Sequence, residues 1–311
     1  MSPPSLAEIP QLQSLGVSLR RLLASQQVLV IASDQRLICC WSTRQGWSWR
    51  SAPLPEGSCR DGMPMQREAI GELLADLLLD AEVAPGQLTL LLPLAGGHWR
   101  VLDGATLDQV TALEASQEWL DALDWPLQPT DSYCSLAGLG GAVMAIGVSR
   151  TLLQAWIDVV EMADLPLHRV DWALLSACRG LNAVLGDWTA DVAWLFPDGP
   201  ALRMVLIRAG VPEVDQMFKR DQPDRLRQEI RRCVAAWQSE AIVSAPLGWW
   251  LSFSENEAEG WLPLIDPDRG EQRLDAAMTW SPDPVIDESS QDTLSPLDQL
   301  GLYGMVLEAK R

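Results

Sequence analysis

The stretch that decides the fold is AIGVSRTLLQAWIDVVEMADLPLHRVDWALLSACRGLNAVLG, residues 145–186. Its apolar residues change spacing three times, between the short continuous runs of buried strands and the three-to-four-residue period of helices. This order predicts the strand Ala142–Val148, the helix Leu152–Ala163 capped by Ser149, the strand Leu167–Val170, and a helix from Asp171 or Trp172 to Leu185. Strands that alternate with helices in this way are typical of α/β proteins.

The flanking sequence continues the alternation and adds two hairpins. Before the central stretch we predict strands Val28–Ser33 and Leu37–Trp41, helix Met65–Asp80, strands Gln87–Leu94 and Trp99–Leu102, and helix Leu107–Leu123. After it we predict a hairpin of Asp191–Phe196 and Leu202–Arg208 across the turn 197–200, helix Pro223–Trp237, strand Ala241–Ser244, an irregular and partly mobile segment 252–295, and helix Leu297–Lys310. The whole pattern predicts an α/β protein with mixed, mainly parallel sheets.

Composition excludes several classes of function. The 311 residues carry 23 Lys and Arg against 42 Asp and Glu, a formal net charge of −19. So acidic a chain repels phosphate, which argues against nucleic acid as a partner. The longest apolar run, Leu73–Leu94, is interrupted by three acidic residues and a proline, so no membrane span is expected. The first residues lack the basic flank and apolar core of a secretory signal, so we expect a soluble protein inside the cell.

Motifs for metal or nucleophilic chemistry are missing from the sequence. Six cysteines include no CxxC pair, and there are only two histidines, His98 and His168, which we interpret as surface or structural residues. The thiols are interpreted as buried and reduced. The cluster Gly138-Leu139-Gly140-Gly141 could cradle a phosphate, but it precedes a predicted strand, so loop or hairpin glycines are favoured. We predict no metal and no cofactor.

The order of segments resembles the PilM-type proteins of type IV pilus assembly, a branch of the actin-like (FtsA-like) superfamily, through most of residues 27–245 and the last helix. LLLPLAGGHWRVL (90–102) is similar to the family's strand, Pro-containing turn and Arg-bearing strand, with Pro93 and Arg100 in the expected places. LDQVTALEASQEWL (107–120) resembles its next helix. Residues 145–186 resemble its strand–helix–strand–helix unit, with 163–165 as the turn after the first helix.

The resemblance implies an actin-like (ribonuclease H-like) two-lobed fold with mixed sheets flanked by helices and a reduced second lobe. It implies a first lobe at 27–186 with an inserted subdomain at about 104–170, a reduced second lobe at 187–295, and a C-terminal helix at 296–311 that returns to the first lobe. Active members hold Mg-ATP with two hairpin phosphate loops and a glycine pair near the adenosine.

This chain departs from the family at each nucleotide-binding position. The first loop, DIGSSSIK-like in the family, matches a turn with Ser33, Asp34 and Gln35, which lacks glycine and adds a carboxylate. The second, DIGASTT-like, is matched to residues 191–195, where Asp191 is kept but Trp194 brings bulk.

The remaining two departures from the family concern the part of the fold that binds or covers the adenosine. Ala245 and Pro246 stand where we place the glycine pair after the late strand, and proline removes an amide donor. Only about a dozen residues separate Gly210 from the helix at 223, too few for the small subdomain that covers the nucleotide in relatives. We therefore expect a pseudo-ATPase without catalytic residues.

The function implied is a non-catalytic cytoplasmic scaffold of type IV pilus assembly, peripheral to the inner membrane. Its partner would be the cytoplasmic tail of a PilN-like single-span membrane protein, with the pilus assembly ATPase complex as a further partner. We place the docking groove on the surface formed by helix 65–80 and segment 87–123. Two alternatives stay open: a nucleotide-binding actin-like ATPase or sugar-kinase relative, and a GspL-like component of a type II secretion platform.

Overall fold

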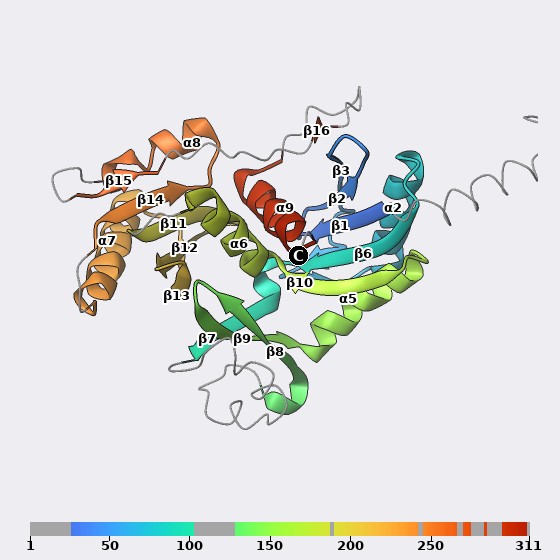
Figure 1. The fold of residues 1–311 in the computed structure, drawn as a ribbon, viewed down its shortest axis with the longest axis horizontal. Helices are drawn as coiled ribbons and strands as arrows, with labels where there is room; N and C mark the ends of the chain where they lie inside the picture. The colour runs from blue at the N-terminus through green and yellow to red at the C-terminus, as the bar shows by residue number, and fades with distance from the viewer. Residues whose placement is uncertain are drawn as a thin grey trace, which may run out of the picture. The chain divides into compact units, whose positions relative to one another are not determined.

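The computed structural model describes residues 26–102, 128–186, 190–241, 245–265, 270–274, 283–284 and 294–309. These residues form two compact units, each assembled from separate stretches of the chain (Figure 1). The first unit takes its described residues from 1–96, 151–173 and 282–292, and the second from 97–150, 174–281 and 293–311. This division does not test the lobe boundaries expected from the sequence, which remain a prediction.

The first unit is built on a sheet in the order β10-β6-β1-β2-β3-β16. Its centre is the antiparallel hairpin β1–β2, and β6 and β10 extend the sheet in parallel from β1. The middle of β1 is buried on both faces, which explains its uninterrupted apolar run. The strands are β1 (Gln26–Ala32), β2 (Arg36–Ser42), β3 (Trp47–Pro53), β6 (Pro85–Leu92), β10 (Leu167–Trp172) and β16 (Asp283–Pro284).

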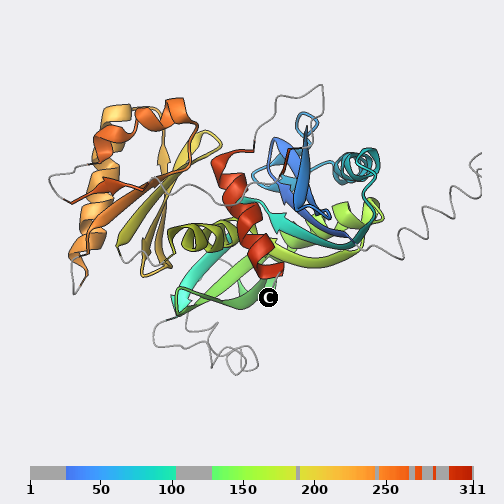
Figure 2. The same cartoon turned by 45° about the horizontal axis from the view of Figure 1, so that its top comes forward.

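Two helices of the first unit pack against each other. They are α2 (Arg67–Asp80) and α5 (Arg150–Met162), which lie side by side in both views (Figures 1 and 2). Gly71 of α2 permits the close approach, because a Cβ there would lie 2.9 Å from the carbonyl oxygen of Val159 and 3.0 Å from the Cβ of Met162. An ion pair between Arg67 and Asp158 closes the same interface. A short hairpin, β4 (Cys59–Arg60) with β5 (Met63–Pro64), precedes α2, and a 3-10 turn, η2 (Leu94–Gly96), follows β6.

The second unit repeats the strand order of the first. Its five-stranded sheet runs β13-β12-β11-β14-β15, with two antiparallel pairings followed by two parallel ones. Both sheets therefore share the order third, second, first, fourth, fifth strand along the chain, and the first sheet adds a sixth strand, β16, beside β3. The strands are β11 (Asp191–Asp198), β12 (Ala201–Arg208), β13 (Val211–Lys219), β14 (Leu247–Leu251) and β15 (Gln272–Arg273).

Helix α7 (Pro223–Ser239) covers one face of this sheet (Figure 1). Its buried residues recur at helical spacing: Leu226, Ile230, Val234 and Trp237. They form a core with inward-facing residues of the strands. Phe253 and Leu264 belong to this core too. Along the chain, α8 (Glu255–Glu259) lies between them, and Leu264 is the last residue of the 3-10 turn η5 (Leu262–Leu264).

A three-stranded sheet also belongs to the second unit. It consists of β7 (Gly97–Leu102), β9 (Ala142–Ser149) and β8 (Ser132–Leu139) in the order β7-β9-β8, preceded by η4 (Pro129–Asp131). The β8–β9 turn uses Gly140 at φ +61°, and it touches the β12–β13 turn at Gly210. Asn182 donates from its amide Nδ2 to the carbonyl oxygen of Gly210 at 2.7 Å. The glycine cluster is thus a hairpin turn, as predicted.

Helices α6 (Ala173–Leu185) and α9 (Pro296–Ala309) cross closely in the second unit (Figure 2). Gly180 faces the backbone of Leu300, Gly304 faces that of Ser176, and no side chain of any size fits at either glycine. The hydroxyl of Ser176 donates to the carbonyl oxygen of Gly301 at 2.7 Å. The predicted C-terminal helix is confirmed, and it packs on α6.

Most predicted elements are confirmed, and the others differ as follows. The predicted strand Ala241–Ser244 is wrong at Ala241, which lies in no strand, and 242–244 lie outside the described residues. The late strand is β14 instead. Strands β3, β8 and β13 were not predicted, and the dozen residues after Gly210 form β13 rather than a plain connection. The segment 252–295 contains packed elements and buried side chains in its described part. The predicted helix Leu107–Leu123 lies outside the described residues.

Candidate functional site

The candidate site residues lie at three places: the β1–β2 turn of the first sheet, strand β11 of the second sheet, and the residues just before β14. In the first unit, the β1–β2 turn contains Ser33, Asp34 and Gln35, as predicted. The hydroxyl of Ser33 donates to the carbonyl oxygen of Arg36 at 3.0 Å and accepts from the Arg36 amide at 3.1 Å. These bonds close a tight turn around the serine.

Asp34 holds the β4–β5 hairpin to this turn. Its carboxylate accepts from the backbone amides of Asp61 at 2.9 Å and Gly62 at 2.7 Å. The thiol of Cys59 lies 3.3 Å from the same carboxylate, and burial, followed by Asp34, raises the pKa of that thiol to about 12. The Asp34 carboxylate is therefore a structural hydrogen-bond acceptor, filled by the chain's own amides.

The placement of Asp191 and Trp194 in a second phosphate loop is wrong. Strand β11 runs without a break from Asp191 to Asp198, so both residues lie inside a sheet. The Trp194 side chain is fully buried, its ring centroid lies 4.5 Å from that of Phe196, and its indole N–H donates to the hydroxyl of Ser252 at 2.9 Å. The apolar run from Val192 to Phe196 is uninterrupted, and such a run favours a buried strand over a loop.

Asp191 is a buried carboxylate at the start of β11. It is 3% exposed, and its Oδ1 lies 3.7 Å from Nε of Arg208. Burial raises the pKa of Asp191, and the nearby Arg208 opposes that shift. The arginine is fixed by Glu213, whose carboxylate accepts from Arg208 at 2.7 Å, and by the ring of Trp237, 4.3 Å away.

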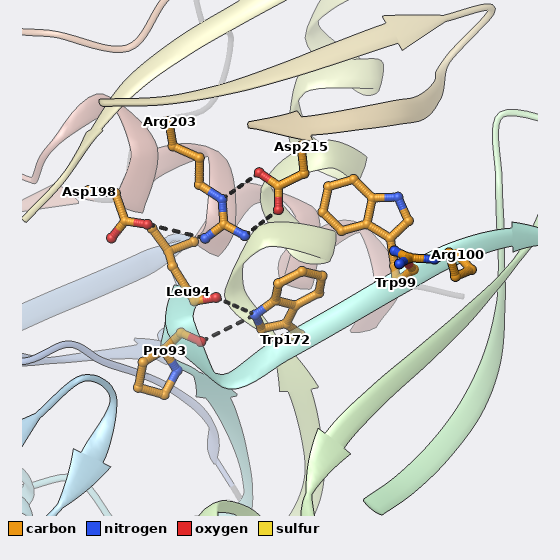
Figure 3. A network of polar contacts seen from close by, with 8 residues as sticks. All are labelled: Pro93, Leu94, Trp99, Arg100, Trp172, Asp198, Arg203 and Asp215. Carbon is orange, nitrogen blue, oxygen red and sulfur yellow. Dashed lines mark hydrogen bonds and ion pairs between the residues drawn. The ribbon is translucent and has the colours of Figure 1, made fainter. Parts of the chain in front are cut away.

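The hairpin turn of the second unit lies between Asp198 and Ala201, and a buried arginine stands beneath it. Arg203 of β12 is 4% exposed. Its guanidinium makes a two-pronged contact with Asp215 of β13, Nε to Oδ1 at 2.8 Å and Nη2 to Oδ2 at 2.6 Å. Nη1 also donates to Asp198 at 3.2 Å. Figure 3 shows the guanidinium lying between the two carboxylates, one from the turn and one from the edge strand.

Sequence reasoning missed this Arg203 cluster, defined as Asp198, Arg203 and Asp215. Burial of a full charge is costly unless it is paired, so the three side chains must be considered together. One signal in the sequence indicates the cluster. Arg203 is a cation within the apolar strand ALRMVLIR, and the neighbouring strands carry acidic residues.

Ala245 and Pro246 do not follow the late strand; they come directly before β14. This placement corrects the prediction. The carbonyl oxygen of Pro246 accepts from the amide of Asp191 at 3.0 Å, so the two residues lead into the parallel pairing of β14 with β11. The residues that follow β14 are Ser252 and Phe253, which are 2% and 5% exposed. The Phe253 ring stacks on Trp261 with centroids 5.6 Å apart.

Pro93 and Arg100, which carry the resemblance, have local structural roles. In the first unit the indole N–H of Trp172 is shared by the carbonyl oxygens of Pro93 and Leu94, 3.2 Å from each (Figure 3). The end of β10 thereby fixes the turn after β6. In the second unit the guanidinium of Arg100 donates to the carbonyl oxygen of Trp99 at 3.0 Å.

The described parts of the chain contain neither a candidate metal site nor a candidate membrane-spanning helix. There, no group of three His, Cys, Asp or Glu side chains has a geometry that could hold a metal ion. Among the same residues, no helix is long and apolar enough to cross a bilayer. The prediction of no metal and no cofactor remains a prediction.

Two sheets with the same strand order, each opened by a hairpin and flanked by helices, define the mixed α/β architecture of the actin-like fold, and the predicted fold class is confirmed. No family model and no curated protein sequence matches the chain. Among solved structures, a chain of a PilM-PilN type IV pilus biogenesis complex is similar with a TM-score of 0.68 at 14% identity, over 92% of this chain and 98% of that chain. At this identity the likeness shows the fold alone.

Two further structures are more distant. The cytoplasmic domain of EpsL, an inner-membrane component of the type II secretion system of Vibrio cholerae, gives a TM-score of 0.48 at 13% identity, over 91% of this chain and 95% of that chain. A Bacteroides thetaiotaomicron protein with an actin-like ATPase fold and unknown function gives 0.46 at 9% identity, over 80% and 91%. Neither score is high enough to support an argument about function.

Proposed function

We propose that the protein is a non-catalytic scaffold of type IV pilus assembly that binds the cytoplasmic tail of a PilN-like single-span membrane protein. The observation that supports this best is the likeness to a PilM-PilN complex over 92% of this chain and 98% of that one. The protein would act in the cytoplasm, beside the inner membrane, through its partner.

The contacts made by the two hairpin turns support the proposal that the protein is not a catalyst. Phosphate loops of NTPases hold anions with free backbone amides, commonly at glycines. In the first unit the β1–β2 turn presents Asp34, whose carboxylate binds the β4–β5 hairpin. In the second unit the β11–β12 turn presents Asp198, bound to Arg203. Each turn places a carboxylate where an ATPase would place phosphate, and repulsion between the anions disfavours nucleotide.

The partner half of the proposal is tested by titration. A fluorescent peptide with the sequence of the cytoplasmic tail of the single-span protein encoded beside this one is titrated with the full chain, and a scrambled peptide is the control. Dissociation at micromolar concentration or below is expected, about −8 kcal/mol or stronger. Equal binding of both peptides, or of neither, would count against a PilN-like partner.

The catalytic half is tested by thermal unfolding with and without millimolar Mg-ATP. A ligand at about 100 times its Kd stabilises a fold by about 2.7 kcal/mol, which raises the midpoint of a chain of this size by several degrees. We expect no shift. A clear upward shift would favour the alternative, a nucleotide-binding ATPase of pilus assembly. Binding only to a type II secretion partner would favour the GspL-like alternative.

A further inference from the structure

Strand β13 forms an open edge of the second sheet. It is nine residues long and pairs on one side only, with β12. Among the described residues, no strand pairs with its other side, and no backbone group of β13 bonds to the backbone of a turn or loop. A row of unpaired amides and carbonyls is a template for a further strand. The outer edge of β13 therefore has unused capacity for hydrogen bonds.

The equivalent edge of the first sheet is closed. Strand β3 is the third strand of that sheet along the chain, as β13 is of the second, and β16 pairs with it in parallel. The contact joins Asp283 to Ser48 and Pro284 to Trp49. In the described part of the second unit, no strand is added to β13 in this way. Comparison of the two sheets therefore identifies β13 as the edge where a further strand would extend the second sheet.

The regular part of β13 carries a symmetric pattern of side chains. The pairing with β12 shifts register before Val214 and continues without a shift from there to Lys219. Within this stretch Asp215, Met217 and Lys219 share one face of the strand, because side chains alternate. An acid and a base thus stand two residues before and two residues after a methionine that is 52% exposed. Lys219 is exposed too, and among the described residues no ion pair joins it to a carboxylate.

This pattern is complementary to a second copy of itself. When two identical strands pair antiparallel about a two-fold axis, opposite side chains share a face of the sheet, so the axis must pass through a residue. An axis at Met217 places Asp215 of each copy opposite Lys219 of the other. It also places the two Met217 side chains opposite each other. Opposite charges and apolar pairs in such positions stabilise antiparallel strands.

Other registers are less favourable. An axis at Asp215 would place two carboxylates face to face. An axis at Gln216 would bring Lys219 opposite Glu213, but the ladder shifts there, and the Glu213 carboxylate already accepts from Arg208 at 2.7 Å. Asp215 lies in the regular part of the ladder, and its side chain is 26% exposed. A carboxylate that holds one arginine can still accept from a lysine.

We propose that two copies of the protein associate through β13, antiparallel about Met217, so that the second sheet of one copy continues into that of the other. A lysine on an edge strand discourages pairing with other chains, and a partner that presents an acid opposite Lys219 removes this penalty. The interface uses the same residues of both copies, so the assembly closes as a dimer. The inference is independent of the proposed function.

Sedimentation velocity of the full-length protein over a range of concentrations tests the association. We expect a monomer–dimer equilibrium in the wild-type protein. Met217→Lys places two like charges opposite each other at the axis, so it should weaken the dimer at least about tenfold. Met162→Lys is the matched control, because Met162 lies on α5 of the first unit and is 55% exposed, close to the exposure of Met217. It should leave the dimer unchanged, and both variants should keep the urea midpoint of the wild-type protein.

Disulfide cross-linking tests the register. In a buffer with oxidised glutathione, Met217→Cys should form a covalent dimer, because opposite residues have Cβ atoms about 4.5–5.5 Å apart, near the reach of a disulfide. Gln216→Cys is the control, because the two copies of that position would lie diagonally, about 7–8 Å apart, and should not be linked.

Four results would overturn the proposal. They are a wild-type protein that stays monomeric at every concentration, a dimer that survives Met217→Lys, equal cross-linking of the two cysteine variants, and slowed amide exchange of β13 that arises only when another protein's peptide is added. The last result would assign the edge to a different partner.

Discussion

The β1–β2 turn of the first unit and the β11–β12 turn of the second occupy equivalent places in two sheets of the same strand order, yet they are closed by opposite means. At the first, an exposed carboxylate collects backbone amides, through Asp34. At the second, a buried cation is held between two carboxylates, through Arg203. At the first turn, backbone amides near solvent bind a carboxylate. At the second, fully charged side chains pair in the interior. Mutations at the two turns should therefore have different effects on stability.

The largest effect is expected where the charge is buried. Arg203→Met should lower the free energy of unfolding by about 3–5 kcal/mol, because it leaves Asp198 and Asp215 facing each other without a cation. Urea denaturation measures the change. Arg203→Lys keeps the charge but loses the two-pronged geometry, so its loss should be smaller.

Arg225 supplies the control for this experiment. It pairs with Glu229 on the outside of α7, with side chains 70% and 41% exposed. Arg225→Met should change the free energy of unfolding by no more than about 0.5 kcal/mol. If Arg203→Met and Arg225→Met cost the same, the Arg203 cluster does not stabilise the second unit.

An intermediate effect is expected at the turn of the first unit. Asp34→Ala should cost about 1–2 kcal/mol, because the amides of Asp61 and Gly62 lose a charged acceptor but can turn to water. Asp34→Asn, which keeps one acceptor oxygen, should cost less. Exchange of the amides at 61 and 62 should quicken in both variants, and unchanged exchange would show that Asp34 does not hold the β4–β5 hairpin.

The smallest effect concerns Asp191. Burial raises the pKa of this carboxyl, so the folded state keeps its proton at pH values where the unfolded state, with a pKa of about 3.9, has lost it. The stability contributed by the protonated form is therefore lost as pH rises through the folded-state pKa. Asp191→Asn cannot ionise, so its unfolding midpoint relative to wild type should rise between about pH 3.5 and neutral pH. A difference that stays constant with pH would show that Asp191 titrates normally.

Apolar spacing was sufficient to predict most of the architecture, and it failed where strands carry charge. Strands β1, β6 and β11 are buried on both faces, so their apolar runs are continuous and easy to recognise. Strand β13 lies at an edge and alternates charged with apolar residues, as in Glu213-Val214-Asp215, and the sequence pattern predicts no element there. Edge strands need no second apolar face, so they leave a weaker signal.

The local structure around the candidate site residues could be predicted in part from the sequence. The β1–β2 turn was located correctly because a polar pair interrupts two apolar runs. The second loop is matched to residues 191–195 by resemblance, although the apolar run continues to Phe196. Ala245 and Pro246 are predicted to follow the late strand, whereas they precede β14. Arg203 could not be found from periodicity, because its role depends on contacts across three strands.

The contact of Gly140 with Gly210 has a mechanical consequence for the second unit. The β8–β9 turn rests on the β12–β13 turn backbone against backbone, with Asn182 bonded to Gly210 at 2.7 Å. A junction of this kind contains no long side chain that could stretch or change rotamer under load. A displacement of the β8–β9 turn would therefore be transmitted to β12 and β13, the strands that carry Arg203 and Asp215.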